Sequence, residues 1–169
     1  TYGRVETVDH VRGLKYVQEF HNNLTQIDPP KITKVKSKPY TKVTFKPDYT
    51  RMGIDGLNPF MLELFRKRVY DIAAVTDKKI KVKLDSNIVP IKDFQQYVSM
   101  YIGEKDETAR LYERGDDRWE YAVCLTPHAE FTQVSFVNGI YPSQGGKHVE
   151  YILNQIVRKL VAHIKKKKK

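Results

Sequence analysis

The strongest constraint on the fold is a change in hydrophobic periodicity at Asn58-Pro59. Before it, apolar residues alternate as in half-exposed strands, and no helical period appears before residue 56. After it, apolar residues recur at the spacing of an amphipathic helix. Asn is a good helix N-cap and Pro suits the first helical position. We therefore expect an antiparallel sheet in the first third and mixed structure beyond it.

The first third is predicted to contain four strands. Residues 5–11 and 14–20 are rich in β-branched and aromatic side chains, and they flank Arg12-Gly13 as in a hairpin. Residues 31–35 and 40–45 then alternate basic and β-prone side chains, which is typical of half-exposed strands.

The rest of the chain is predicted to be an α+β layer with helices on one face of a mixed sheet. The predicted helices cover residues 58–74, 94–102 (with Asp93 as N-cap) and 149–164. The predicted strands cover residues 80–84, 111–113, 119–125 and 131–137. In the first helix, Arg66, Lys67 and Arg68 are expected to face solvent.

The last predicted helix has the cleanest pattern and runs directly into five lysines, Lys165 to Lys169. These lysines supply half of the chain's formal net charge of +10. A basic balance of this kind indicates a nucleic acid or an anionic surface, with a solubilising tail as the alternative. Five lysines exceed what the helix macrodipole favours. We expect the run to contact phosphates without reading bases.

The sequence contains no self-contained active site. It lacks both glycine-rich phosphate-binding motifs, and no histidine fits the H-E-x-x-H zinc pattern. We interpret all five histidines as surface or structural: His10, His21, His128, His148 and His163. Gly145-Gly146-Lys147 is interpreted as a tight turn, although such a turn could present N–H groups to an anion. Asp116-Asp117 is interpreted as a solvated turn.

Cellular context is constrained by cysteine content and hydropathy. Cys124 is the only cysteine, which excludes an intrachain disulfide and favours a reducing compartment. No apolar run approaches the ~20 residues that span a bilayer, so no membrane partner is expected. Thr1 is not a methionine and the sequence stops within a charge run, so we expect a piece of a longer protein.

Three blocks near the end of the sequence resemble the transducer domain of eukaryotic-type DNA topoisomerase II. They cover residues 134–140 (V-S-F-V-N-G-I), 145–149 (G-G-K-H-V) and 155–160 (Q-I-V-R-K-L). Residues 30–33 and 40–48 resemble the last strands of that family's ATPase domain. Residues 66–72 resemble its first transducer helix, and residues 118–120 a strand start. The resemblance covers nearly the whole chain, in the family's order.

The resemblance implies a division into two parts. Residues 1–56 would be the closing strands of a GHKL ATPase domain, and residues 57–169 the first part of a transducer with a ribosomal-S5-domain-2-like fold. In the family, ATP with Mg²⁺ closes a homodimeric gate on a DNA duplex, in the nucleus or in the cytoplasm where replication is cytoplasmic. The family's lysine run faces that duplex, which carries over to Lys165, Lys166, Lys167 and Lys168.

The resemblance also implies that the family's chemistry lies outside this stretch. The residues that hold Mg-ATP would precede Thr1. The Gln-Thr-Lys loop that reaches the γ-phosphate and the cleavage tyrosine would follow Lys169. We therefore predict no catalytic, cofactor-binding or metal residue here, and no activity of this stretch alone. A stand-alone basic S5-like nucleic-acid-binding module and a gyrase B type relative remain as alternatives.

Overall fold

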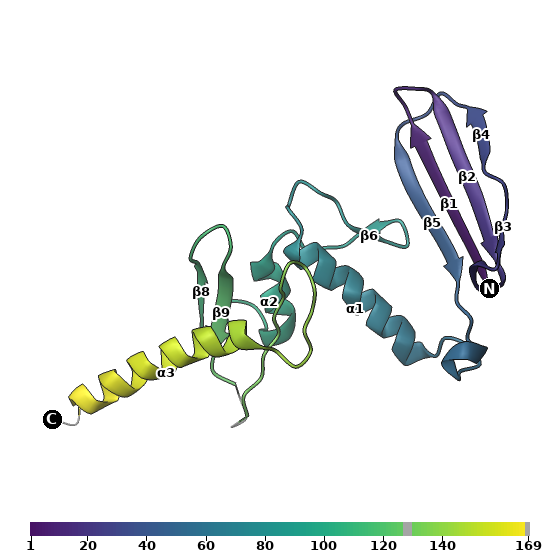
Figure 1. The fold of residues 1–169 in the computed structure, drawn as a ribbon. Coiled ribbons are helices and arrows are strands. Elements are labelled where there is room, and N and C mark those ends of the chain that lie inside the picture. The colour runs from purple at the N-terminus through teal and green to yellow at the C-terminus, as the bar shows by residue number, and fades with distance from the viewer. Residues whose placement is uncertain (127–129, 168–169) are drawn as a thin grey trace. The chain divides into compact units, whose positions relative to one another are not determined.

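The computed structural model describes residues 1–126 and 130–167, which divide into two compact units, Thr1–Asn58 and Pro59–Lys169 (Figure 1). The first unit consists of antiparallel strands and two short 3-10 helices, and the second combines α-helices with antiparallel hairpins. The α+β class is therefore as predicted. Within the described residues, no helix has the length and apolarity that crossing a membrane requires.

The first unit is one sheet with the strand order β3-β2-β1-β5, in which β4 also pairs with β2. Its strands are β1 (Tyr2–Asp9), β2 (Leu14–His21), β3 (Gln26–Ile27), β4 (Lys31–Lys34) and β5 (Tyr40–Lys46). Its 3-10 helices are η1 (Asn22–Leu24) and η2 (Thr50–Met52). The predicted hairpin is confirmed, because β1 pairs with β2 from Tyr2↔His21 to Asp9↔Leu14.

The carboxylate of Glu6, whose negative charge is balanced by basic neighbours, connects the strands in the middle of this sheet. Glu6 of β1 is only 9% exposed. It pairs with Lys15 of β2 at 3.1 Å and with Arg4 at 2.7 Å, and it accepts a hydrogen bond from the Tyr40 hydroxyl of β5. The Tyr40 hydrogen bond, followed by the one from Lys15, lowers the pKa of Glu6 to about 2. One side chain thus links three neighbouring strands.

The second unit contains the three predicted helices. They are α1 (Pro59–Val75), α2 (Phe94–Ile102) and α3 (Lys147–Lys167). Between them lie the strands β6 (Lys83–Leu84), β7 (Asn87–Ile88), β8 (Arg110–Arg114) and β9 (Glu120–Cys124). The Asp93 cap is confirmed, because its carboxylate accepts a hydrogen bond from the Gln96 N–H at 2.9 Å.

Two predicted strands are wrong or shortened. Residues 80–84 contribute only the two residues of β6, and residues 131–137 form no strand beyond an isolated bridge between Val137 and Ile140. A β-prone run needs a neighbouring strand for its backbone hydrogen bonds, and no described strand pairs with this one. The predicted mixed sheet is also not found among the described residues, where β6–β7 and β8–β9 are separate antiparallel pairs.

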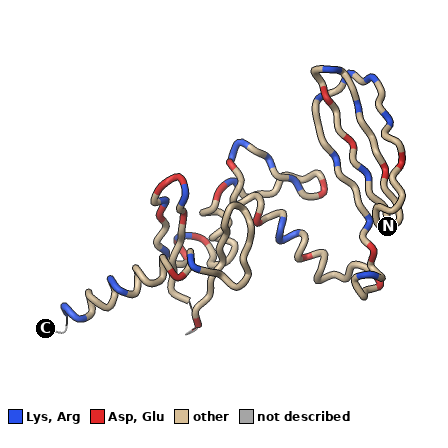
Figure 2. The backbone as a smooth tube through the Cα atoms, in the orientation of Figure 1, with Lys and Arg blue, Asp and Glu red and all other residues tan. Residues whose placement is uncertain are grey.

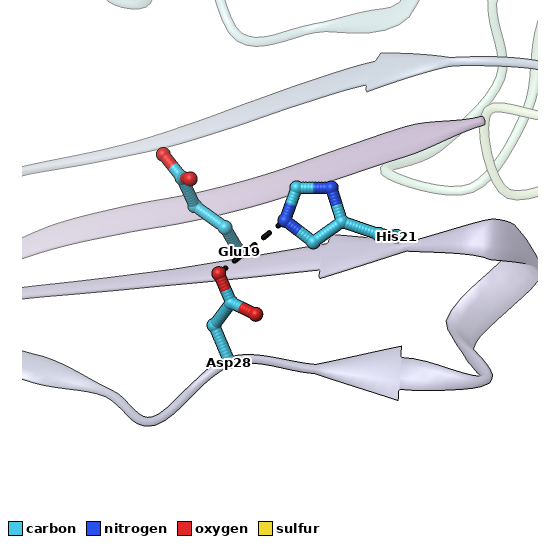
Figure 3. A group of neighbouring side chains, drawn as sticks. All are labelled: Glu19, His21 and Asp28. Carbon is cyan, nitrogen blue, oxygen red and sulfur yellow. Dashed lines mark hydrogen bonds and ion pairs between the residues drawn. The ribbon is translucent and has the colours of Figure 1, made fainter.

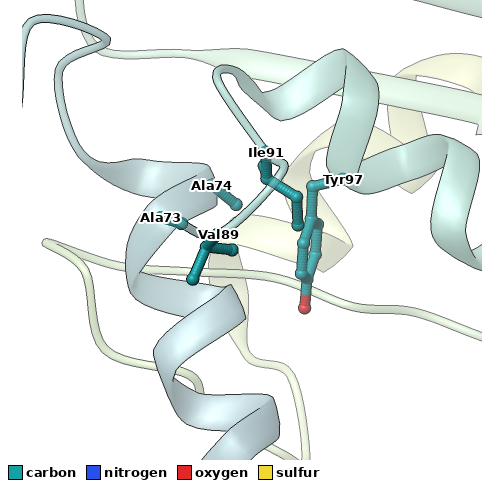
Figure 4. Packing of buried hydrophobic residues seen from close by; sticks show 5 residues of the cluster. All are labelled: Ala73, Ala74, Val89, Ile91 and Tyr97. Carbon is teal, nitrogen blue, oxygen red and sulfur yellow. The ribbon is translucent and has the colours of Figure 1, made fainter. Parts of the chain in front are cut away.

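The core of the second unit lies where the end of α1 meets α2 and the segment before it. Figure 4 shows the buried cluster, which comprises Ala73, Ala74, Val89, Ile91 and Tyr97. Phe136 packs on the Tyr97 ring edge-on, with 5.7 Å between the ring centroids. The first half of α1 lies outside this core: Leu62, Leu64 and Phe65 are 42%, 61% and 53% exposed.

The solvent-facing prediction for the basic run of α1 is partly wrong. Arg66 is exposed, but Lys67 and Arg68 are half-buried. Lys67 donates to both carboxylate oxygens of Asp71, at 3.0 and 2.9 Å, and Arg68 donates to the Gly139 carbonyl at 2.8 Å. Asp71 is only 2% exposed, and Lys67 is half-buried because it pairs with this carboxylate. The helical period alone did not predict this burial.

Candidate nucleic-acid interface

The predicted phosphate-contacting lysines lie at the end of α3. The helix continues through Lys167, so Lys165, Lys166 and Lys167 are helical, and all three are exposed. Figure 2 shows this basic end of α3 in blue. Lys168, the fourth predicted contact, lies outside the described residues.

The helical geometry adds two basic residues that sequence reasoning did not assign. Residues seven apart on an α-helix lie within about 20° of the same direction. Arg158 therefore shares a side of α3 with Lys165, and Lys159 shares one with Lys166. All four are exposed. The seven-residue spacing from Lys165 and Lys166 could have identified these two residues from the sequence. Together, the four residues extend the basic surface about two turns back along the helix.

The last turn of α3 carries the sign of charge that the helix dipole favours, while its first turn holds both Lys147 and Glu150. Glu150 lies in the first turn, and the three lysines lie in the last turn. The ion pairs within residues 1–126 and 130–167 do not include these lysines. Their ammonium groups thus remain available to an external anion.

The first turn of α3 is held in place by a short polar network. His148 Nε2 lies 2.9 Å from Ser135 Oγ, which in turn donates to the Gln133 side chain at 2.9 Å. Tyr151 contacts Trp119, with 5.7 Å between the ring centroids. Since the Ser135 hydroxyl donates to Gln133, its proton is not directed at His148. The pair therefore connects the first turn of α3 to the segment at Gln133.

The glycine turn before α3 is the predicted tight turn. Gly145 has φ +72° and its N–H bonds to the Pro142 carbonyl at 2.9 Å. The N–H groups of Val149 and Glu150 bond to the Gly146 carbonyl. The N–H groups of Gly145, Val149 and Glu150 are thus used within the turn and the start of the helix.

Asp116 and His21, two of the remaining polar candidates, have partners within the described residues. Asp116 accepts hydrogen bonds from the N–H groups of Arg118 and Trp119, at 2.7 and 2.9 Å, as in a capped turn. Cys124 is a half-buried free thiol on β9. His21 contacts Asp28 at 3.3 Å. His128 falls outside the described residues. Of the candidate sites named from the sequence, the basic end of α3 is the one that presents several exposed cations on a described helix.

Comparison with known proteins places this geometry in a family context. The family model described as DNA gyrase B matches residues 93–169. The DNA topoisomerase 2 of Candida glabrata is 44% identical over 98% of this chain, and that of Arabidopsis thaliana is 42% identical over 98%. The chain spans only 13% and 12% of the length of these two relatives.

Solved structures agree over the same extent of the chain. The ATPase region of Saccharomyces cerevisiae topoisomerase II matches 98% of this chain with a TM-score of 0.89 and 44% identity. The ATPase and transducer domains of DNA topoisomerase II from Balamuthia mandrillaris match 98% with a TM-score of 0.87 and 34% identity. The chain covers 44% and 42% of those two structures.

Proposed function

The chain belongs to the DNA topoisomerase II family, and we propose that it couples the ATPase domain of a type II topoisomerase to the transport of a DNA duplex. The observation that carries the proposal is the match of almost the entire chain, in sequence and in fold, to the ATPase region of yeast topoisomerase II. The parent enzyme would pass one duplex through another while hydrolysing ATP.

We assign residues 1–56 to the closing strands of the GHKL ATPase domain and residues 57–169 to the first part of the transducer. The division of the chain into compact units at Asn58 and Pro59 supports this boundary. ATP and Mg²⁺ would be bound by residues outside this stretch, so the stretch alone should not hydrolyse ATP. The parent enzyme would act as a homodimer, closed through its ATPase region, in the nucleus.

The part of this function that the present residues would carry is contact with DNA phosphates. Lys165, Lys166, Lys167 and Lys168 would face the captured duplex, with Arg158 and Lys159 extending the contact along α3. The exposure of the three described lysines and their lack of ion pairs within the described residues support this role. Such contacts position a duplex without reading its sequence.

The test is salt-dependent binding of a short labelled duplex to the 169-residue chain, followed by fluorescence anisotropy. Replacing Lys165, Lys166 and Lys167 together by Glu should weaken binding and make the slope of log affinity against log salt shallower by about 3. The matched control replaces Lys78, Lys79 and Lys81 by Glu, since these exposed lysines of the same unit give the same change in charge.

Equal losses in the two triple variants would refute a specific role of α3, because net charge alone would then explain binding. In the parent enzyme, the α3 variant should lose DNA stimulation of ATP hydrolysis and keep the basal rate. Unchanged DNA stimulation would show that the lysines form only a solvated surface. Measurable ATP turnover by the 169-residue chain would contradict the assignment of the ATP site to residues outside it.

A further inference from the structure

A cluster of metal-ligand side chains lies in the first unit, away from the proposed DNA contact. Glu19, His21 and Asp28 each place one ligand atom within 4.8 Å of the others. Figure 3 shows the His21 ring nitrogen directed at the Asp28 carboxylate, with Glu19 on the neighbouring position of the same strand face. We propose that these three side chains form a binding site for a transition-metal divalent cation, best fitted by Zn²⁺.

The backbone prearranges this site. Glu19 and His21 are two residues apart on β2, so their side chains project from the same face. Strand β3 pairs His21 with Gln26, and the Asp28 N–H continues this pairing by bonding to the Glu19 carbonyl at 3.0 Å. The Gln18 side chain donates to the Asp28 carbonyl at 3.1 Å. All three ligands are therefore carried by hydrogen-bonded backbone rather than by a free loop.

The distances suit a tetrahedral ion. Zn²⁺ bonds to imidazole nitrogen and carboxylate oxygen at about 2.0 to 2.2 Å, which separates two ligand atoms by about 3.3 Å. His21 Nε2 and Asp28 Oδ2 are already 3.3 Å apart. The Glu19 carboxylate completes the set with a side-chain rotation, and water would supply the fourth ligand. The three side chains are 34%, 31% and 40% exposed, so an ion can enter from solvent.

The chemistry of the ligands selects the class of cation. One imidazole with two carboxylates suits Zn²⁺ and similar transition metals, whereas Mg²⁺ and Ca²⁺ prefer oxygen ligands alone. Arg4 lies 3.5 Å from Glu19 and Tyr2 donates to the same carboxylate at 3.1 Å. The guanidinium partly offsets the negative charge of the cluster. Replacing Arg4 by Gln should therefore strengthen metal binding.

The experiment is a titration of the 169-residue chain with ZnCl₂ in a buffer that does not chelate metals, measured by calorimetry. Asp28→Asn and His21→Gln should each weaken Zn²⁺ binding by about tenfold or more, as losses at metal sites do. The matched control is His10→Gln, which removes an exposed histidine beside Asp9 in the same unit and should leave binding unchanged. An about tenfold excess of Mg²⁺ should not displace the Zn²⁺.

A second measurement on the unaltered chain does not depend on the folding of any variant. In an NMR titration, the imidazole signals of His21 should shift at lower Zn²⁺ concentration than those of the other histidines. Equal sensitivity of His10 in either experiment, or displacement by an equal concentration of Mg²⁺, would overturn the site. A Zn²⁺ affinity that survives both His21→Gln and Asp28→Asn would do the same.

Discussion

Replacing Asp71 by Ala is expected to destabilise the second unit substantially. Asp71 is 2% exposed and accepts two hydrogen bonds from Lys67 and one, at 2.5 Å, from the Tyr97 hydroxyl. Tyr97 also contacts the Tyr101 hydroxyl at 3.0 Å, and Lys67 lies 4.3 Å from the centre of the Tyr141 ring. The Asp71 carboxylate therefore bonds α1 to α2, and its partner Lys67 contacts the segment before α3 through Tyr141.

The size of the stability loss depends on the Lys67 ammonium group, which is left without its partner when the Asp71 carboxylate is removed. Losing one partner of a buried charge pair costs about 3 to 5 kcal/mol. Lys67 is 37% exposed, so water can replace part of its lost interaction and the lower end of that range applies. We expect Asp71→Ala to reduce the free energy of unfolding by about 3 kcal/mol and Tyr97→Phe by about 1 kcal/mol.

The assay is urea unfolding followed by the fluorescence of Trp119, the only tryptophan and a residue of the second unit. The double variant should cost less than the sum of the two single variants, because both remove the same hydrogen bond. Additive losses would show that Tyr97 and Asp71 are not coupled. A loss below about 1 kcal/mol for Asp71→Ala would refute the view that this carboxylate organises the unit.

Acid and capping variants test two other local features. The hydrogen bond from Tyr40 and the partners Lys15 and Arg4 depress the pKa of Glu6 to about 2, so its contribution to stability is full above the ordinary pKa of 4.5 and is lost as pH falls toward 2. The hydrogen-exchange protection factors of the β1 amides, which correct for the intrinsic pH dependence of exchange, should therefore fall as the pH is lowered through that window. Glu6→Gln should reduce this fall, and a variant that keeps it in full would contradict the assignment. Asp93→Ala should lower the stability of the second unit by about 1 kcal/mol in the same Trp119 assay, while the exposed control Asp106→Ala should have little effect, and equal losses would contradict the capping role.

Elements with a local signal could be predicted from the sequence, and elements that need a distant partner could not. The Asn58-Pro59 start of α1 and the Asp93 cap of α2 each depend on a few neighbouring residues. The run 131–137 has strand propensity, but a strand also needs a neighbour, which the sequence does not reveal. Burial of Asp71 was missed because an aspartate four residues after Lys67 is typical of an exposed helix pair.

The candidate sites also differ in how much of them a local sequence signal could predict. The lysine run is visible in the sequence, although its alignment with Arg158 and Lys159 required the helix to extend to Lys167. In the metal-ligand cluster, the two-residue spacing of Glu19 and His21 predicts a shared strand face. Asp28 could not be added without the pairing of β2 with β3, which brings it back beside Glu19.

The course of α3 determines how the lysine experiment should be interpreted. Three consecutive helical residues spread over about 200° of the helix surface, so the lysines cannot all face one side of a rigid duplex groove. Flexible side chains on an exposed helix end can still each reach a phosphate along the backbone. Single replacements of Lys165, Lys166 and Lys167 should then change the salt slope by similar amounts, about 1 each. A contribution concentrated in Lys166 alone would instead indicate that the duplex lies along the side that Lys166 shares with Lys159.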